Sequence, residues 1–336
     1  MTFTGSKAAK VASQGNSPSL AKLWAKRYVR DLVSYSQLSV ERDRTGLVEA
    51  NSPEGRAQTV TKLLRSLNFA SAQAWGTTEQ LLSEQVKKHQ IDPQYINPWQ
   101  VARDSYHIFE KVLEAYREGK TPQSLVNIIG PDCSQIRKAA TEQDPRVLGF
   151  TSMQIHYTGR MLMDPLSTEE RLLATEYFKV VDDHLYMPLQ RAYSAAASYD
   201  ERSPVLKAVQ TLLPASSVIA KQISETVLIA HPNYRCYSGF LKESQVRISS
   251  IRDIEMFQLY LCVCLLEQDI SAVQGELFPL CIMIYPVLGV HWWLVRELVS
   301  LLGQTIHKYL PEDVGQMFCP YVEAIEAIFS QDVVGL

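Results

Sequence analysis

The chain of 336 residues lacks the composition of several specialised protein classes. Glycine and proline are sparse, at 15 and 16 residues, which disfavours a turn-rich β fold. The net charge of -3 gives no global reason to expect nucleic-acid binding. Charged residues make up only 21%, and the hydrophobic fraction of 46% is typical of a globular protein rather than a disordered one.

The motifs of common catalytic and metal sites are also missing. No glycine-rich phosphate loop, H-E-x-x-H sequence or nucleophile elbow occurs. The cysteines form no C-x-x-C pair, and side chains two apart on a helix point about 200° apart, which excludes a shared metal for Cys262 and Cys264. We therefore expect no metal site, and buried, reduced thiols in a cytoplasmic protein. The six cysteines are Cys133, Cys236, Cys262, Cys264, Cys281 and Cys319.

A membrane span is disfavoured, although the stretch LFPLCIMIYPVLGVHWWLV at 277–295 has nearly the length of one. Prolines and Gly289 interrupt it and Arg296 follows at once, so we expect a buried helix pair broken near Gly289. The first residues contain no apolar core of a signal peptide, and 1–18 is expected to be a flexible lead-in.

Helical patterns fill most of the chain, and no alternating strand pattern extends beyond a few residues. A first helix is expected after Ser17 as N-cap with Pro18 at its first position. Ser167 and Glu170 form a capping box ahead of an apolar face over 173–185. The sequence predicts an all-α protein.

We expect two folded units. A helical N-terminal domain of unknown type occupies 19–148, and a second helical domain occupies 149–336, with the boundary near the sequence QDPRVLGF. No internal repeat is visible, which disfavours a solenoid.

One apolar stretch, SSIRDIEMFQLYLCVCLLEQDISAV at 249–273, opens on two adjacent charges. A buried helix avoids such a pair unless something satisfies it. The chain continues with a regular succession of motif positions. In order, these positions are Arg252-Asp253, Tyr260, Asp269-x-Ser271 and Tyr285-x-x-Leu288-Gly289-Val290.

This succession resembles that of the phycobiliproteins, the light-harvesting subunits of cyanobacterial and red-algal antennae. Their order is C-x-R-D, a tyrosine-bearing helix, G-D-x-S and Y-x-x-L-G-V, and the match runs without a gap from Ser250 to Val290. The upstream HPNY is similar to the PNY that precedes the family's chromophore helix. The resemblance covers about 150–336 and does not explain 1–145.

The resemblance implies a globin-like helical domain preceded by a helical hairpin that pairs subunits. The hairpin corresponds to 151–197, so association with a partner or a homodimer through this region is expected. In the family, the Arg-Asp pair holds a bilin propionate and the pyrrole nitrogens. The residues that match this pocket are Ser250, Arg252, Asp253 and Tyr260.

Ser250 stands at the position of the cysteine that carries the bilin in the family, and a serine hydroxyl cannot form the thioether bond. Two interpretations remain open. The Arg-Asp pair either holds a bilin without a covalent link or is a relic that bridges helices. We favour the relic, because a partly buried charged pair is commonly satisfied by the protein itself. Cys236 and Cys319 are alternative attachment points, and we expect both to be structural thiols.

Further departures predict a changed pocket. The family's G-D is Gln268-Asp269, and the proline that usually follows L-G-V is His291. Pro279 and Pro286 fall where the family keeps a continuous helix, so a kink is expected there.

Other candidate sites have weaker support. The acidic and histidine side chains of 182–184 diverge by about 100° per residue, so they do not converge on one metal ion, and the histidine is expected in the core. A hydrolase set of His231, Cys236 and Asp253 has no supporting spacing. Haem ligation by His231 or His291 would require a loop to reach the pocket.

The sequence-level expectation is a regulatory or adaptor protein connected to the antenna complex, the phycobilisome, or to cyanobacterial signalling, and not an enzyme. The alternative is a sensor or carrier that binds a bilin or another hydrophobic ligand without a covalent bond. Residues 1–66 carry +6 and the remainder -9, so a basic first helix is a candidate surface for a protein partner. Its basic residues are Lys22, Lys26, Arg27 and Arg30.

Overall fold

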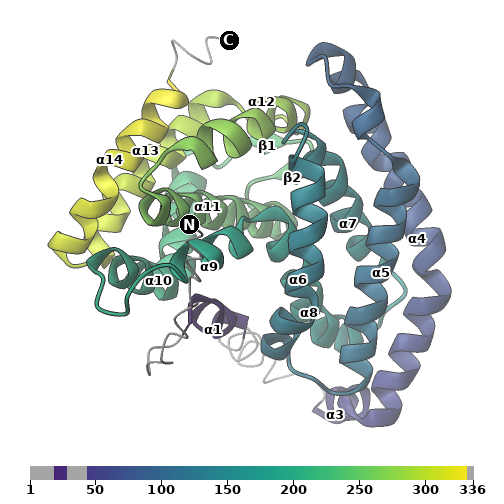
Figure 1. Cartoon of the computed structure of the whole chain (residues 1–336). Helices are drawn as coiled ribbons and strands as arrows, with labels where there is room; N and C mark the ends of the chain where they lie inside the picture. The colour runs from purple at the N-terminus through teal and green to yellow at the C-terminus, as the bar shows by residue number, and fades with distance from the viewer. Residues whose placement is uncertain (1–18, 29–43, 331–336) are drawn as a thin grey trace, which may run out of the picture.

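The computed structural model describes residues 19–28 and 44–330, and over these residues the protein is almost entirely helical (Figure 1). Thirteen α-helices, one 3-10 turn, one π-helical segment and a ribbon of two short strands make up the described part. The prediction of an all-α protein is confirmed for it. The predicted flexible segment 1–18 lies outside the described residues.

From α3 onward, the described elements follow one another with short connections. The first part of the chain comprises α1 Leu20–Ala25, α3 Arg44–Asn51, α4 Pro53–Lys88, η1 Pro93–Tyr95, α5 Pro98–Arg117 and α6 Pro122–Thr141. The next helices are α7 Val147–Met163, α8 Thr168–Tyr186, α9 Leu189–Ala196 and α10 Pro204–Ala230. The last part comprises β1 Arg235–Cys236, β2 Gly239–Phe240, α11 Ser244–Glu267, η2 Val273–Leu277, α12 Phe278–Val287, α13 Trp292–Tyr309 and α14 Glu312–Ile328.

Several helices begin with a polar cap followed by proline, which has no N–H to lose at that position. The pairs with a side-chain cap are Ser52-Pro53, Asn97-Pro98 and Thr121-Pro122. The capping box of Ser167 and Glu170 at the start of α8 is confirmed. In the described residues α1 begins at Leu20, where the Ser19 hydroxyl accepts from Lys22 N–H, while Ser17 and Pro18 lie outside the described part.

Two helices end at a glycine in the left-handed conformation. Gly119 has φ +69 after α5, and Gly289 has φ +68 after α12. After α12, the Val290 N–H donates to the Tyr285 carbonyl and the Gly289 N–H to the Pro286 carbonyl, which together form a Schellman motif. The Y-x-x-L-G-V sequence is therefore a helix-stop signal, and the expected break near Gly289 is confirmed.

The helix α7 forms the centre of the structure. It packs against α4, α5, α6, α8 and α12, and its residues 147–155 are all buried. Figure 1 shows α4 to α7 on one side and α10 to α14 on the other. One continuous hydrophobic core includes buried residues on both sides of the boundary expected near 144–151.

Much of the hairpin 151–197 is covered within the chain, and the expected association with a partner through this region stays a prediction. The described helices α4, α5 and α6 cover α7 and α8, and most hairpin residues are buried within the chain. The sequence did not indicate this, because nothing in 19–148 identified the surface that its helices cover.

The kink expected around Pro279 takes the form of a π-helical segment, Val273–Leu277. Phe278 N–H donates five residues back to the Val273 carbonyl, and Pro279 then has no N–H with which to restore the regular ladder. Pro286 lies within the last turn of α12. Among the described helices, none is both long enough and apolar enough to span a bilayer.

Candidate functional site

The charged pair of α11 lies where α11 meets α7 and α8. The Arg252 guanidinium lies 3.3 Å from the Asp182 carboxylate of α8 and 3.6 Å from Asp253. It also stacks over the Tyr186 ring at 4.3 Å from the ring centroid. The side chain of Arg252 is only 17% exposed, so its charge is balanced almost entirely from within the protein.

The carboxylate of Asp182 also contacts a second basic side chain besides Arg252. Its carboxylate lies 2.8 Å from His156 Nδ1 on α7. Burial opposes ionisation of Asp182, but His156 and then Arg252 outweigh burial and lower the pKa of this carboxyl below its usual value. A polar cluster of Arg252, His156 and Asp182 therefore ties three helices together.

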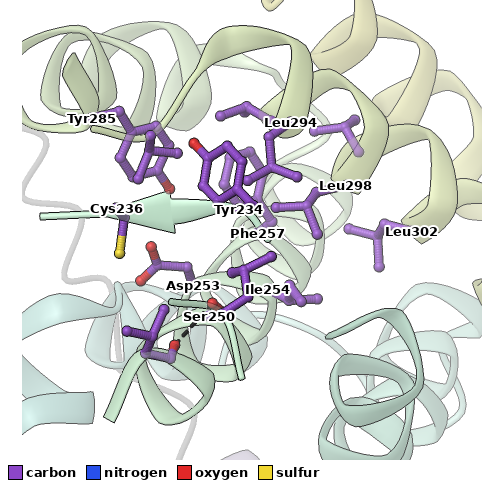
Figure 2. Close-up of a pocket in the computed structure, with 15 residues that line it drawn as sticks. Tyr234, Cys236, Ser250, Asp253, Ile254, Phe257, Tyr285, Leu294, Leu298 and Leu302 are labelled. Atoms are coloured by element: carbon purple, nitrogen blue, oxygen red, sulfur yellow. Dashed lines mark hydrogen bonds between the residues drawn. The ribbon is translucent and has the colours of Figure 1, made fainter. Parts of the chain in front are cut away.

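Asp253, which contacts Arg252 of this cluster, also lines a cavity (Figure 2). Burial raises the pKa of Asp253, against the opposing effects of Arg252 and Tyr186. Ser250, one helical turn earlier, lines the same cavity, as the i, i+3 spacing predicts. Its hydroxyl donates to the Val246 carbonyl at 2.9 Å and is satisfied within the helix.

The cavity is small and apolar, with a volume of about 60 Å³. Its walls come mainly from α11 and α13, as Figure 2 shows for Ile254, Phe257, Leu294, Leu298 and Leu302. A water molecule occupies about 30 Å³ of liquid, and sites for drug-sized ligands span about 300 to 1,000 Å³. In this conformation the cavity is too small for a tetrapyrrole.

Tyr260, the fourth residue of the proposed pocket, does not face this cavity. It is fully buried, accepts from Arg137 Nη2 at 2.7 Å and lies 3.3 Å from Glu276. The structure therefore separates Tyr260 from the three other pocket residues, because two more turns of α11 carry it toward α6.

The cysteines differ in their surroundings. Burial raises the pKa of Cys264 to about 12, and it also raises the pKa values of Cys133, Cys262 and Cys281. Cys236 is partly exposed and lines the cavity of Ser250 and Asp253 (Figure 2). Cys319 lies 3.2 Å from His307 Nε2 and is not among the residues that line the cavity.

The side chains of 182–184 diverge to separate partners, as their helical spacing predicts. Asp183 accepts from the Tyr28 hydroxyl and from Lys179, whereas His184 is buried beside the Val180 carbonyl. Of the hydrolase set, His231 contacts Glu297 at 2.7 Å, and only Cys236 and Asp253 share a cavity.

The basic first helix divides into two faces. Lys22 and Lys26 are exposed, whereas Arg27 is only 8% exposed and forms an ion pair with Glu255 of α11. This burial corrects the assignment of Arg27 to an exposed basic surface, because α1 inserts that face against α6, α9 and α10. Arg30 lies outside the described residues.

Sequence reasoning missed the residues that contact Arg252 from other helices. His156, Asp182 and Tyr186 lie 66 to 96 positions before it, and no local pattern links them. The one available signal was the polar run at 182–184 on an otherwise apolar helix. No family model, curated protein or solved structure matches the chain.

Proposed function

We propose that the protein is a phycobiliprotein-like adaptor or regulatory protein that carries no chromophore and acts through protein–protein contact. The main support is the state of the Arg-Asp pair. Arg252 is paired with Asp182 and stacked on Tyr186, and the cavity beside Asp253 has about one fifth of the smallest volume typical of ligand pockets, about 300 Å³. This arrangement favours the bridging role over the ligand clamp.

The backbone supports the family resemblance on which this proposal rests. Where the family has the glycine of G-D-x-S, Gln268 adopts the left-handed conformation with φ 54. Glycine adopts this conformation most readily, and a larger residue costs about 1–2 kcal/mol there. The Asp269 carboxylate then accepts from the Ser271 N–H at 2.8 Å and starts the next helix. The G-D-x-S pattern thus matches a turn that needs these residue types.

A surface suited to a protein partner lies where the HPNY loop meets the start of α13. Its four rings contact one another at centroid distances of 4.8 to 6.4 Å, and Trp293 is 40% exposed. Aromatic side chains of this kind supply much of the binding energy in protein interfaces. We call this surface the aromatic cluster; it consists of His231, Tyr234, His291 and Trp293.

The adaptor proposal predicts binding to antenna proteins through the aromatic cluster. Phycobilisomes purified from a cyanobacterium are expected to co-sediment with the protein, and Trp293→Ala should weaken the interaction about tenfold or more. Trp99→Ala is the matched control, because Trp99 is 82% exposed and lies on α5. Absence of co-sedimentation would contradict the link to the antenna, and equal loss in both variants would contradict binding through the aromatic cluster.

A second candidate function, a bilin carrier, is favoured by the position of Cys236. This thiol lines the same cavity as Ser250 and Asp253, so a cysteine from the β1–β2 ribbon faces the place where the family's attachment cysteine is missing. A bilin could be attached only if the cavity opened well beyond its present volume. The two candidates differ in whether the protein made beside bilins is coloured.

A further inference from the structure

A second cavity, of about 220 Å³, lies between α6, α8, α9 and the π-helical segment, where the two parts of the chain meet. Unlike those of the first cavity, the residues that line it are all polar or charged. Three cations and one carboxylate line it: Arg137, Lys138, Arg191 and Glu276. Sites at the junction between folded units often bind small ligands.

Two of the three cations are already engaged by the protein. Arg137 donates to the Leu185 carbonyl at 2.8 Å and to Glu276 at 3.0 Å. Arg191 donates to both oxygens of Glu267, each at 2.7 Å, and forms a further ion pair with Glu276. These contacts fix the floor of the cavity. The two arginines are balanced there by the carboxylates of Glu267 and Glu276, so any positive excess comes from the third cation.

The third cation is free to bind a ligand. Lys138 is exposed and forms no ion pair with another described residue, so its ammonium group is the available charge at the rim. The hydroxyls of Ser134 and Ser194 also line the cavity and offer further donors. The cavity therefore presents several donors to an incoming anion.

One residue of the cavity lining, His184, has an unpaired acceptor. His184 is 2% exposed, and its Nδ1 lies 2.8 Å from the Val180 carbonyl, which can only accept, so we assign the ring proton to Nδ1. Nε2 then carries a lone pair, and it has no hydrogen-bond partner. Burial lowers the pKa of His184, which keeps the ring neutral. A ligand that satisfies Nε2 must donate a proton.

The backbone at this cavity is also unusual. Glu276, which joins Arg137 to Arg191, lies on the π-helical segment Val273–Leu277. Short π-helical segments interrupt helices at a cost in regular hydrogen bonding and are frequent at functional sites. Here the segment places one carboxylate between two guanidinium groups.

We propose that this cavity binds a protonated phosphate group, either inorganic phosphate or a small phosphomonoester. The phosphate oxygens accept from Lys138 and from the two serine hydroxyls, and the remaining P–OH donates to His184 Nε2. The volume exceeds that of an apolar cavity that binds benzene, about 150 Å³, and leaves room for a short organic group.

Calorimetric titration of the full chain with sodium phosphate, glycerol 3-phosphate and sulfate tests this site. At about pH 6 phosphomonoesters retain a proton in roughly half of the molecules. Sulfate has similar oxygens and no proton, so it is expected to bind about tenfold more weakly, because Nε2 then stays unpaired. Tighter binding of glycerol 3-phosphate would identify a phosphomonoester site, and tighter binding of inorganic phosphate a site for the free ion.

Two variants assign the contacts. Lys138→Ala, at an exposed position, should weaken all three anions about tenfold. His184→Asn keeps an N–H for the Val180 carbonyl and removes Nε2, so it should abolish the preference over sulfate. Lys207→Ala is the control, because Lys207 is an exposed lysine on α10. Absence of phosphate binding, equal binding of sulfate, or no effect of Lys138→Ala would overturn the proposal.

Discussion

Replacing Arg27 by alanine is expected to speed hydrogen exchange at the backbone amides of α1 about a hundredfold, which corresponds to a loss of about 3 kcal/mol. Arg27 is buried against the Trp24 ring at 3.9 Å and forms an ion pair with Glu255, which is only 2% exposed. Burial opposes the charge on Arg27, but Glu255 and Asp183 outweigh it and raise its pKa. Truncation would leave Glu255 in the core without its main partner.

Hydrogen exchange followed by mass spectrometry measures this effect on α1 directly, because it reports the opening of individual segments. Lys26→Ala is the control, since Lys26 is the exposed neighbour of Arg27 and should leave the exchange unchanged. The double variant Arg27→Met and Glu255→Leu should recover most of the protection, because apolar residues of similar volume can replace a buried ion pair. If Arg27→Ala left α1 as protected as in the wild type, Trp24 and Tyr28 alone would hold the helix.

Replacing Arg252 by alanine is expected to lower the free energy of unfolding by about 3 kcal/mol. The change removes the ion pair with Asp182, the contact with Asp253 and the stacking on Tyr186. Urea denaturation followed by circular dichroism measures the loss. Arg247→Ala is the control on the same helix, because its ion pair with Glu225 is exposed and 3.7 Å long, so the change should cost less than about 1 kcal/mol.

This variant also distinguishes the two interpretations of the Arg-Asp pair. A bridge between helices predicts a large loss of stability in the protein without any ligand. A ligand clamp predicts little loss, because its charge would be satisfied mainly by the bilin. An Arg252→Ala protein as stable as the Arg247→Ala control would therefore favour the clamp and weaken the adaptor proposal.

The local elements could be predicted because their signals are local. The capping box at Ser167 and the helix stop at Gly289 depend on residues within one or two turns, and both are found where the sequence indicates. The first helix also carried a usable signal. Leu20, Trp24, Arg27 and Tyr28 follow the i, i+4, i+7, i+8 spacing of one buried face, and all four are buried. This spacing places Arg27 on the buried face of the helix, so it did not belong among the surface cations.

The long-range partners could not be predicted in the same way. Arg252 meets Asp182 across 70 positions of sequence, and this contact depends on how α7, α8 and α11 pack. The polar cavity likewise combines α6 with α8, α9 and the π-helical segment, which the sequence pattern did not relate to one another. The packing of α4, α5 and α6 on α7 and α8 likewise brings together segments that are distant in the sequence.

The most direct test of the adaptor proposal is an absorbance spectrum of the protein produced in a host that also makes bilins, taken before and after acid denaturation and desalting. The proposal predicts a colourless protein beside a control phycobiliprotein that does become coloured. A visible band lost on desalting would contradict it in favour of a non-covalent bilin pocket. A band that stays with the chain, and disappears in Cys236→Ser, would contradict it in favour of a covalent carrier.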